Sequence, residues 1–167
     1  MQNKRGPLAL AFSGGLDTSY CVPKLSEMGW TVHTVFVDTG GTSAEGRAAI
    51  ARQAEAVGAA SHHEIDAREQ VFDRFVRFLI FGNVLRGEVY PLSVAAERTQ
   101  QAISVIAVAR KLQAQAVAHG STGAGNDQVR FDVALRVLAP ELQVVTPIRD
   151  GGVKREESLA YLRERGL

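Results

Sequence analysis

Short segments of β-strand type, most of them rich in apolar residues, alternate with longer amphipathic segments along this chain. The short segments span residues 8–12, 32–37, 62–65, 116–119 and 143–146, and we predict them to be β-strands. The longer segments repeat apolar residues with a helical period and predict helices over 18–28, 43–57, 70–81, 97–113, 128–138 and 155–165. This alternation is typical of βαβ units and predicts an α/β fold, an open and mostly parallel sheet flanked by helices in a three-layer sandwich.

Two segments need separate interpretation. Within the predicted helix 70–81, Phe72, Phe75, Phe78 and Leu79 recur at helical spacing, and we interpret them as core residues. Residues 82–91 form the one extended connection without clear periodicity. Long connections often carry function, so this segment is a candidate for contact with a ligand.

Composition narrows the class of protein. The chain has 167 residues, 46% of them hydrophobic, which suits one domain of ordinary size. Its formal net charge of +1 argues against binding nucleic acid through bulk charge. No apolar run approaches the roughly 18 residues of a membrane helix, and no Cys and His residues show zinc-ligand spacing. With a single cysteine and no possible internal disulfide, we expect a cytoplasmic protein without nucleic-acid, membrane or metal-ligating sites.

A glycine turn follows the first predicted strand. The segment Ala11-Phe12-Ser13-Gly14-Gly15-Leu16-Asp17-Thr18-Ser19 opens a helix and so lies at the carboxyl edge of the sheet, where ligands of open α/β sheets bind. Two glycines expose backbone N–H groups, and three hydroxyl side chains add donors beside a positive helix terminus. A plain turn capped by Asp17 or Thr18 is an equal alternative for Gly-Gly alone. The strand-to-helix context favours a phosphate cradle.

Neither of the two commoner phosphate-binding motifs is present in this turn. A P-loop requires Gly-x-x-x-x-Gly-Lys-[Ser/Thr], and the turn reaches no lysine before Lys24, well inside the helix. The dinucleotide fingerprint Gly-x-Gly-x-x-Gly is also absent here.

A second glycine-rich segment follows the strand 116–119. Three glycines within residues 120–125 let the backbone approach a ligand closely. Asn126 is placed to cap the next helix, and Asp127 and Arg130 project from its first turn on one face. An acid, an amide and a guanidinium suit both ends of an amino acid. Spacing alone favours an ordinary Asp–Arg pair within the helix, but the glycines at a second carboxyl edge favour a ligand site.

Both segments resemble one known family. Residues 11–19 are similar to the Ser-Gly-Gly-x-Asp-[Ser/Thr]-Ser loop of the N-type ATP pyrophosphatases, and most of all to its argininosuccinate synthase version. The run His119–Phe131 matches the argininosuccinate synthase pattern His-Gly-[Cys/Ser/Ala]-Thr-Gly-x-Gly-Asn-Asp-Gln-Val-Arg-Phe. With the segments 90–92, 138–140 and 146–149, the resemblance covers the whole chain and implies an adenine nucleotide alpha hydrolase-like, Rossmann-like fold.

The resemblance also implies a function. It implies an ATP-dependent ligase of arginine biosynthesis and the urea cycle that adenylates citrulline and condenses it with aspartate, giving argininosuccinate, AMP and pyrophosphate. ATP and Mg²⁺ are the implied cofactors, and the full-length enzyme is implied to be a homo-tetramer. The residues implied to contact ATP are Ala11, Phe12, Ser13, Gly14, Gly15, Leu16, Asp17, Thr18, Ser19, Val37 and Gly120. Those implied to hold aspartate are Thr122, Asn126 and Asp127; those for citrulline are Tyr90, Asn126 and Arg130. No residue is a compelling general base.

The chain departs from the family pattern in places. The family serine that helps bind citrulline falls at Ala95, with Ser93 as a candidate substitute, and a frequent lysine is replaced by Ala124. Family members carry a further synthetase domain, so we expect residues 1–167 to be the nucleotide-binding domain and the isolated chain to be inactive. Two alternatives stay open: another N-type ATP pyrophosphatase and a non-catalytic ATP-binding sensor.

Overall fold

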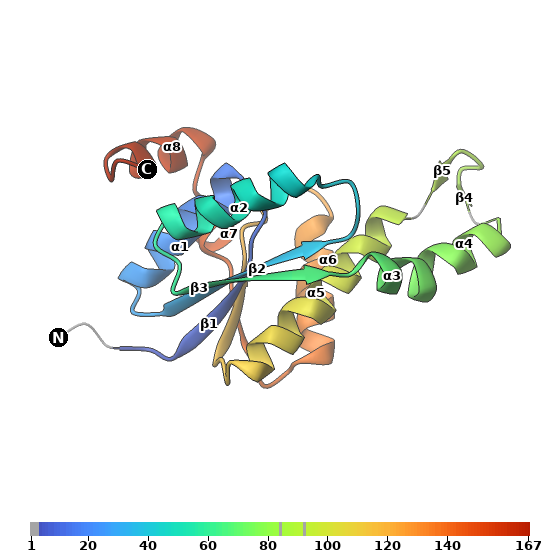
Figure 1. Ribbon diagram of the computed structural model, residues 1–167, viewed down its shortest axis with the longest axis horizontal. Coiled ribbons are helices and arrows are strands. Elements are labelled where there is room, and N and C mark those ends of the chain that lie inside the picture. The colour runs from blue at the N-terminus through green and yellow to red at the C-terminus, as the bar shows by residue number, and fades with distance from the viewer. Residues whose placement is uncertain (1–3, 84, 92) are drawn as a thin grey trace.

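A five-stranded, all-parallel sheet forms the centre of the domain (Figure 1). The computed structural model describes residues 4–83, 85–91 and 93–167, with the backbone alone described for residues 86, 90, 91 and 93–95. The strands are β1 (Pro7–Ala11), β2 (Thr31–Asp38), β3 (Ser61–Asp66), β6 (Ala116–His119) and β7 (Gln143–Val145). Their order across the sheet is β3-β2-β1-β6-β7. The predicted α/β class with a parallel sheet is confirmed.

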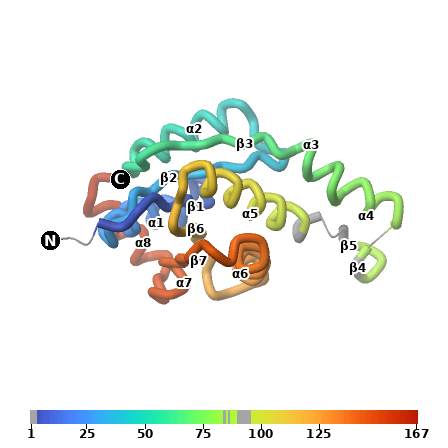
Figure 2. The backbone as a smooth tube through the Cα atoms, turned by 90° about the horizontal axis from the view of Figure 1, so that it is seen from below, coloured from blue at the N-terminus to red at the C-terminus, as the bar shows by residue number. Residues whose placement is uncertain are grey.

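Helices cover both faces of this sheet. They are α1 (Leu16–Glu27), α2 (Ala44–Ala56), α5 (Ser93–Lys111), α6 (Asp127–Leu138), α7 (Pro147–Gly151) and α8 (Arg155–Arg163). Residues of α1, α2, α7 and α8 pack into one hydrophobic cluster, and residues of α5 and α6 pack into another. Figure 2 shows α1 and α8 together on one side of the sheet and α5 and α6 on the other. The chain therefore forms a three-layer sandwich.

Strand β1 connects the two hydrophobic clusters. Its side chains alternate between the faces, so Leu8 and Leu10 join Cys21 in one cluster while Ala9 joins Ile106 in the other. Leu8, Ala9 and Leu10 are all fully buried. Burial on both faces is usual for a central parallel strand, and it fixes the end of β1, from which the first glycine turn departs.

Most predicted elements are present with shifted ends, and two features were missed. Helix α5 begins at Ser93, four residues before the predicted start at residue 97. The short helix α7 was not predicted, because its five residues are too few to show a period. The connection 82–91 contains an antiparallel hairpin of β4 (Leu85–Arg86) and β5 (Tyr90–Pro91).

The segment that precedes this hairpin projects away from the sheet (Figure 1, right). It comprises α3 (Arg68–Val71), a π-helical segment (Phe72–Val76) and α4 (Arg77–Phe81). The interpretation as core is wrong for Phe72 and Phe78, which are 50% and 56% exposed, whereas Phe75 and Leu79 are partly buried. Helical spacing shows that residues share a face, but here that face extends beyond the sheet that would cover it. None of the helices within the described part of the chain is long and apolar enough to cross a membrane.

Candidate functional site

The site lies between β1 and β6, where the connections that leave the parallel strands change from one face of the sheet to the other. Strand β1 pairs with β2 on one side and with β6 on the other. The chain leaves β1 into α1 on one face and leaves β6 into α6 on the opposite face. The two connections therefore diverge from adjacent strand ends, where Ala11 and His119 are paired, and a crevice opens between them.

The first glycine loop, residues 11–19, forms one wall of this crevice. Gly14 has φ +74°, a left-handed conformation that side chains disfavour, and Gly15 occupies the N-cap of α1. No side chain caps this helix, so the alternative of a turn capped by Asp17 or Thr18 is wrong. The Thr18 hydroxyl instead donates to the carbonyl of Gly15 at 3.1 Å. Because no side chain caps α1, the first N–H groups of this helix are available to bind an anion.

The second glycine loop, residues 120–125, meets the first at Gly120. A Cβ atom on Gly120 would lie 3.2 Å from Thr18 Cγ2 and 3.3 Å from the backbone carbonyl carbon of Asp17. Only glycine allows this approach without a shift of the backbone. The two loops therefore form one continuous surface.

A cavity of about 290 Å³ opens along this surface. Its volume lies near the lower end of small-molecule sites. Most of the residues predicted to contact ATP line it, namely Ala11, Phe12, Ser13, Gly15, Leu16, Asp17, Thr18, Val37 and Gly120. Gly14 and Ser19 are not among the lining residues. Ser19 is 2% exposed, and its hydroxyl accepts a hydrogen bond from Gln53 of α2 at 3.2 Å, so its side chain has a structural role.

A second cavity of about 420 Å³ adjoins the first and shares Asp17, Gly120, Ser121 and Asp127 with it. It is lined by all the residues predicted to hold aspartate and by two of those predicted for citrulline, namely Thr122, Asn126, Asp127 and Arg130. The side chains of Tyr90, Ser93 and Ala95 lie outside the described part of the structure. The cavity lined by the residues expected to hold the amino acids thus lies directly beside the cavity lined by the residues expected to hold ATP.

Asp127 stands at the boundary between the cavities. Its two carboxylate oxygens accept hydrogen bonds from Arg130 Nη1 at 2.9 Å and from Arg98 Nε at 3.0 Å. Burial alone would raise the pKa of Asp127, but the hydrogen bonds from these arginines lower it. Asn126 occupies the N-cap of α6 without capping it through its side chain, contrary to the sequence-based prediction. Its amide is therefore available to a ligand.

Behind the second loop lies a network that the sequence did not reveal. His119 is 1% exposed; its Nδ1 accepts from the Ser121 N–H at 3.3 Å, and its Nε2 donates to Asp132 at 3.1 Å. Arg149 in turn donates to Asp132 at 2.7 Å. Burial lowers the pKa of His119, against the opposing effect of Asp132. A neutral His119 therefore fixes the direction in which the second loop leaves β6.

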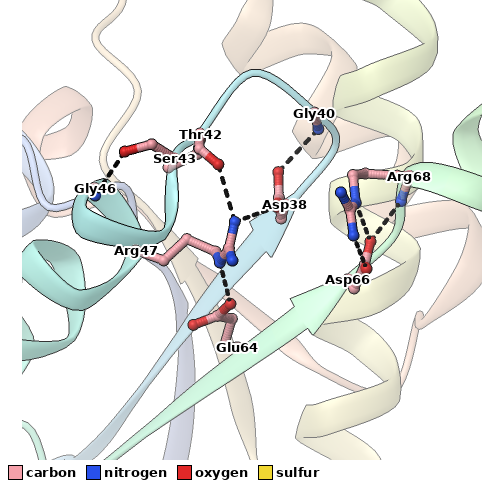
Figure 3. Close-up of polar contacts among 9 residues, drawn as sticks. All are labelled: Asp38, Gly40, Thr42, Ser43, Gly46, Arg47, Glu64, Asp66 and Arg68. Atoms are coloured by element: carbon pink, nitrogen blue, oxygen red, sulfur yellow. Dashed lines mark hydrogen bonds and ion pairs between the residues drawn. The ribbon is translucent and has the colours of Figure 1, made fainter.

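Beyond Val37, a polar cluster fixes the end of β2 (Figure 3). Asp38, 3% exposed, accepts hydrogen bonds from the Gly40 N–H at 2.9 Å and from Arg47 Nη1 at 3.4 Å. Arg47 also donates to the Thr42 carbonyl at 2.9 Å and pairs with Glu64 at 2.8 Å. These contacts tie α2 and the preceding loop to the strand ends beside Val37, where adenine is expected.

These features define a nucleotide-binding α/β domain: a glycine turn, a helix N-terminus without a side-chain cap, and a crevice between adjacent parallel strands whose connections run to opposite faces of the sheet. Residues 7–167 match the family described as the arginosuccinate synthase N-terminal HUP domain, and the chain belongs to this family. It is 44% identical to the argininosuccinate synthase of Xanthomonas campestris over 165 residues, covering 96% of this chain and 41% of that protein. The Pyrobaculum aerophilum enzyme is also 44% identical, with coverages of 96% and 40%.

The chain thus spans about two fifths of the length of these relatives. Among solved structures, a predicted tRNA methyltransferase subunit from Methanocaldococcus jannaschii superposes with a TM-score of 0.60 at 14% identity, covering 95% of this chain and 74% of that one. An NH3-dependent NAD synthetase from Campylobacter jejuni gives 0.53 at 13% identity, with coverages of 70% and 47%. At such identities these two likenesses support the fold alone.

Several residues of the first cavity were missed from the sequence. They are Val35, Phe36, Arg98, Gln101, Val105, His119, Ser121, Phe131 and Arg155. His119, the last residue of β6, and Ser121, within the second glycine loop, could have been predicted from their position at the end of a strand. Arg98 and Arg155 had none, because their helices approach the crevice only through the tertiary fold.

Proposed function

We propose that this chain is the ATP-binding portion of an argininosuccinate synthase. The contact of Gly120 with Thr18 carries the proposal, because it joins a cavity lined by the residues expected to hold ATP to one lined by residues expected to hold both amino-acid substrates. In the proposed reaction, the ureido oxygen of citrulline attacks the α-phosphorus of ATP, and the bond to the β-phosphate breaks with its electron pair leaving on pyrophosphate. The α-amino group of aspartate, as the free amine, then attacks the former ureido carbon of citrullyl-AMP; the bond from this carbon to the oxygen of AMP breaks with its electron pair leaving on AMP, and the proton lost from the amine passes to solvent.

In this scheme the first glycine loop binds the phosphates of ATP, and the residues of the second cavity bind the amino acids. The first glycine loop presents the uncapped N-terminus of α1 to the phosphates. Asp127 and Asn126 accept hydrogen bonds from the amino group of aspartate. The guanidinium of Arg130 binds the carboxylate of citrulline through two hydrogen bonds. In this scheme the loops hold the reactants in contact, so that orientation and charge stabilisation supply most of the rate enhancement, and no side chain is assigned as a general base.

The described residues also fit a magnesium ion bound together with ATP. Mg²⁺ prefers one or two carboxylates together with phosphate oxygens, and Asp17 is an acidic residue that lines both cavities beside the phosphate loop. When bound, the ion would share the negative charge of the pyrophosphate. Asp17 would hold that ion at the junction of the cavities.

Two measurements test the proposal. Calorimetric titration of this chain with Mg-ATP should show saturable binding; a folded chain that does not bind ATP would overturn it. In the full-length protein that contains this domain, exchange of labelled pyrophosphate into ATP should require citrulline. ATP binding with exchange that ignores citrulline would point to another N-type ATP pyrophosphatase, and binding without any exchange would point to a sensor.

A further inference from the structure

Helix α8 is held firmly against α1. The rings of Tyr161 and Tyr20 lie 4.7 Å apart, Arg165 pairs with Glu27, and Leu162 is buried in the cluster shared with α1. Figure 2 shows the two helices together on one side of the sheet. Because α1 starts in the first glycine loop, the start of α8 keeps a fixed position relative to that loop.

The first turn of α8 is itself well defined. The Glu157 carboxylate accepts a hydrogen bond from the Lys154 N–H at 2.9 Å, and the Val153 N–H donates to the Ile148 carbonyl at 3.0 Å. Arg155 is the first residue of the helix and lines the first cavity together with Ser13 and Gly15. The position of Arg155 is therefore fixed by the hydrogen-bonded residues 153 and 154 before it and by helix α8 after it.

The charges around the first cavity distinguish Arg155 from its neighbours. Among the described residues that line this cavity, the arginines are Arg98 and Arg155, and there is no lysine. Arg98 already has a carboxylate partner, because its Nε lies 3.0 Å from Asp127 Oδ2. Arg155 forms no hydrogen bond or ion pair with the described residues. It is therefore the lining cation whose charge is available to an anionic ligand.

We propose that Arg155 binds the β- and γ-phosphates of ATP, opposite the backbone donors of the first glycine loop. The inference rests on the ATP site proposed above and adds the cation that the loop lacks. A guanidinium suits this task because its planar fork matches two phosphate oxygens at once. Since AMP has neither of these phosphates, Arg155 should discriminate between ATP and AMP and should stay with pyrophosphate when it leaves.

The test compares the affinities for Mg-ATP and AMP at one fixed ionic strength, by displacement of a fluorescent adenine nucleotide from this chain. Arg155→Ala should weaken Mg-ATP binding about tenfold or more, the range for hydrogen bonds to charged groups, and change AMP binding by less than about twofold. Arg155→Lys keeps the charge without the fork and should fall between. Arg163→Ala is the control, because Arg163 is exposed on the same helix and does not line the cavity.

The outcomes separate this inference from the proposed function. If the wild-type chain and Arg163→Ala bind Mg-ATP, and Arg155→Ala binds it equally well, Arg155 does not contact the phosphates and the ATP site still stands. An equal loss for ATP and AMP would also overturn the inference, because it would show a general structural effect. A folded wild-type chain that binds no adenine nucleotide would overturn the proposed function and this inference together. If Arg155→Ala lowers the melting temperature, the test rests on Arg155→Lys instead. A ratio of Mg-ATP affinity to AMP affinity below that of the wild type supports the inference, and an unchanged ratio overturns it.

Discussion

Gly120 and Thr18 belong to different glycine loops, yet a Cβ atom on Gly120 would lie only 3.2 Å from Thr18 Cγ2. The residues are far apart in sequence and meet because β1 and β6 are adjacent in the sheet. Any side chain at position 120 would separate the first glycine loop from the second. The contact is thus a geometric requirement of a site built across two strand ends.

Gly120→Ala should therefore weaken ATP binding. The added methyl group would lie 3.3 Å from the backbone of Asp17, so the loop must shift, at a cost of about 1–3 kcal/mol for an overpacked contact. Gly123→Ala is the matched control, since its Cβ would meet Arg149 Cγ at an ordinary 3.8 Å. Calorimetry should show a loss of about tenfold for Gly120→Ala and little change for Gly123→Ala. Equal affinities would show that the loops do not cooperate in binding ATP.

Gly14→Val should abolish ATP binding while the chain remains folded. Gly14 has φ +74°, and its Cβ would lie 3.1 Å from Ile50 Cγ1 of α2, so valine would both strain the loop and displace it, costing about 1–3 kcal/mol in backbone strain alone. Gly15→Ala introduces no such strain, because Gly15 has φ −78°. The melting temperature and titration with Mg-ATP, measured on both variants, test this. Normal ATP affinity in folded Gly14→Val would remove the phosphate-cradle assignment.

The sequence predicted the architecture well because β1 and its neighbours are buried on both faces. Continuous apolar runs such as Leu8–Phe12 and Ala116–His119 have few alternatives once helices of clear period separate them. The exposed phenylalanines Phe72 and Phe78 show the limit. Periodicity reveals a shared face, but whether anything covers that face depends on where the segment lies relative to the sheet.

The candidate site was predictable in part for a similar reason. Residues of the two glycine loops follow strands directly, so the topology alone brings Asp17 and Gly120 together. The network of His119, Asp132 and Arg149 was not predictable, because its members come from a strand and two helices whose packing no local pattern encodes. Arg155 reaches the cavity only because α8 packs on α1.

The folded chain should lose stability as the pH falls below about 6.5, the ordinary pKa of histidine. Burial lowers the pKa of His119, His62 and His33 in the folded state. Between the folded and unfolded pKa values the unfolded chain binds more protons, so acidification favours unfolding, and the loss continues until the folded pKa is reached. Urea midpoints measured from pH 8 to pH 5.5 should decrease below about pH 6.5.

His119→Gln separates the contribution of His119 from that of the other histidines. A glutamine amide can still donate to Asp132 but does not titrate in this range. We expect the variant to be less stable than the wild type at pH 8 and to show a shallower decline between pH 7 and pH 5.5. An unchanged slope would show that His119 is not the buried neutral group that the geometry indicates.

Asp127→Asn should have opposite effects on the two halves of the site. Asp127 is predicted to receive the ammonium group of aspartate, so removing its charge should greatly reduce aspartate use in a full-length synthase that contains this domain. The same carboxylate pairs with Arg98, which lines the first cavity, so the variant leaves that guanidinium without its carboxylate partner and free to attract phosphate. This chain with Asp127→Asn should therefore bind Mg-ATP at least as tightly as the wild type.

The double variant Asp127→Asn/Arg98→Gln tests the cause, since it removes the released charge and should return ATP affinity toward the wild-type value or below it. In the full-length enzyme, citrulline-dependent exchange of pyrophosphate into ATP reports the adenylation step, while argininosuccinate formation reports both steps. Because Asp127 belongs to the second step in this assignment, exchange should survive Asp127→Asn much better than overall turnover. If exchange collapses as far as turnover, Asp127 acts in adenylation itself, and its assignment to aspartate has to be withdrawn.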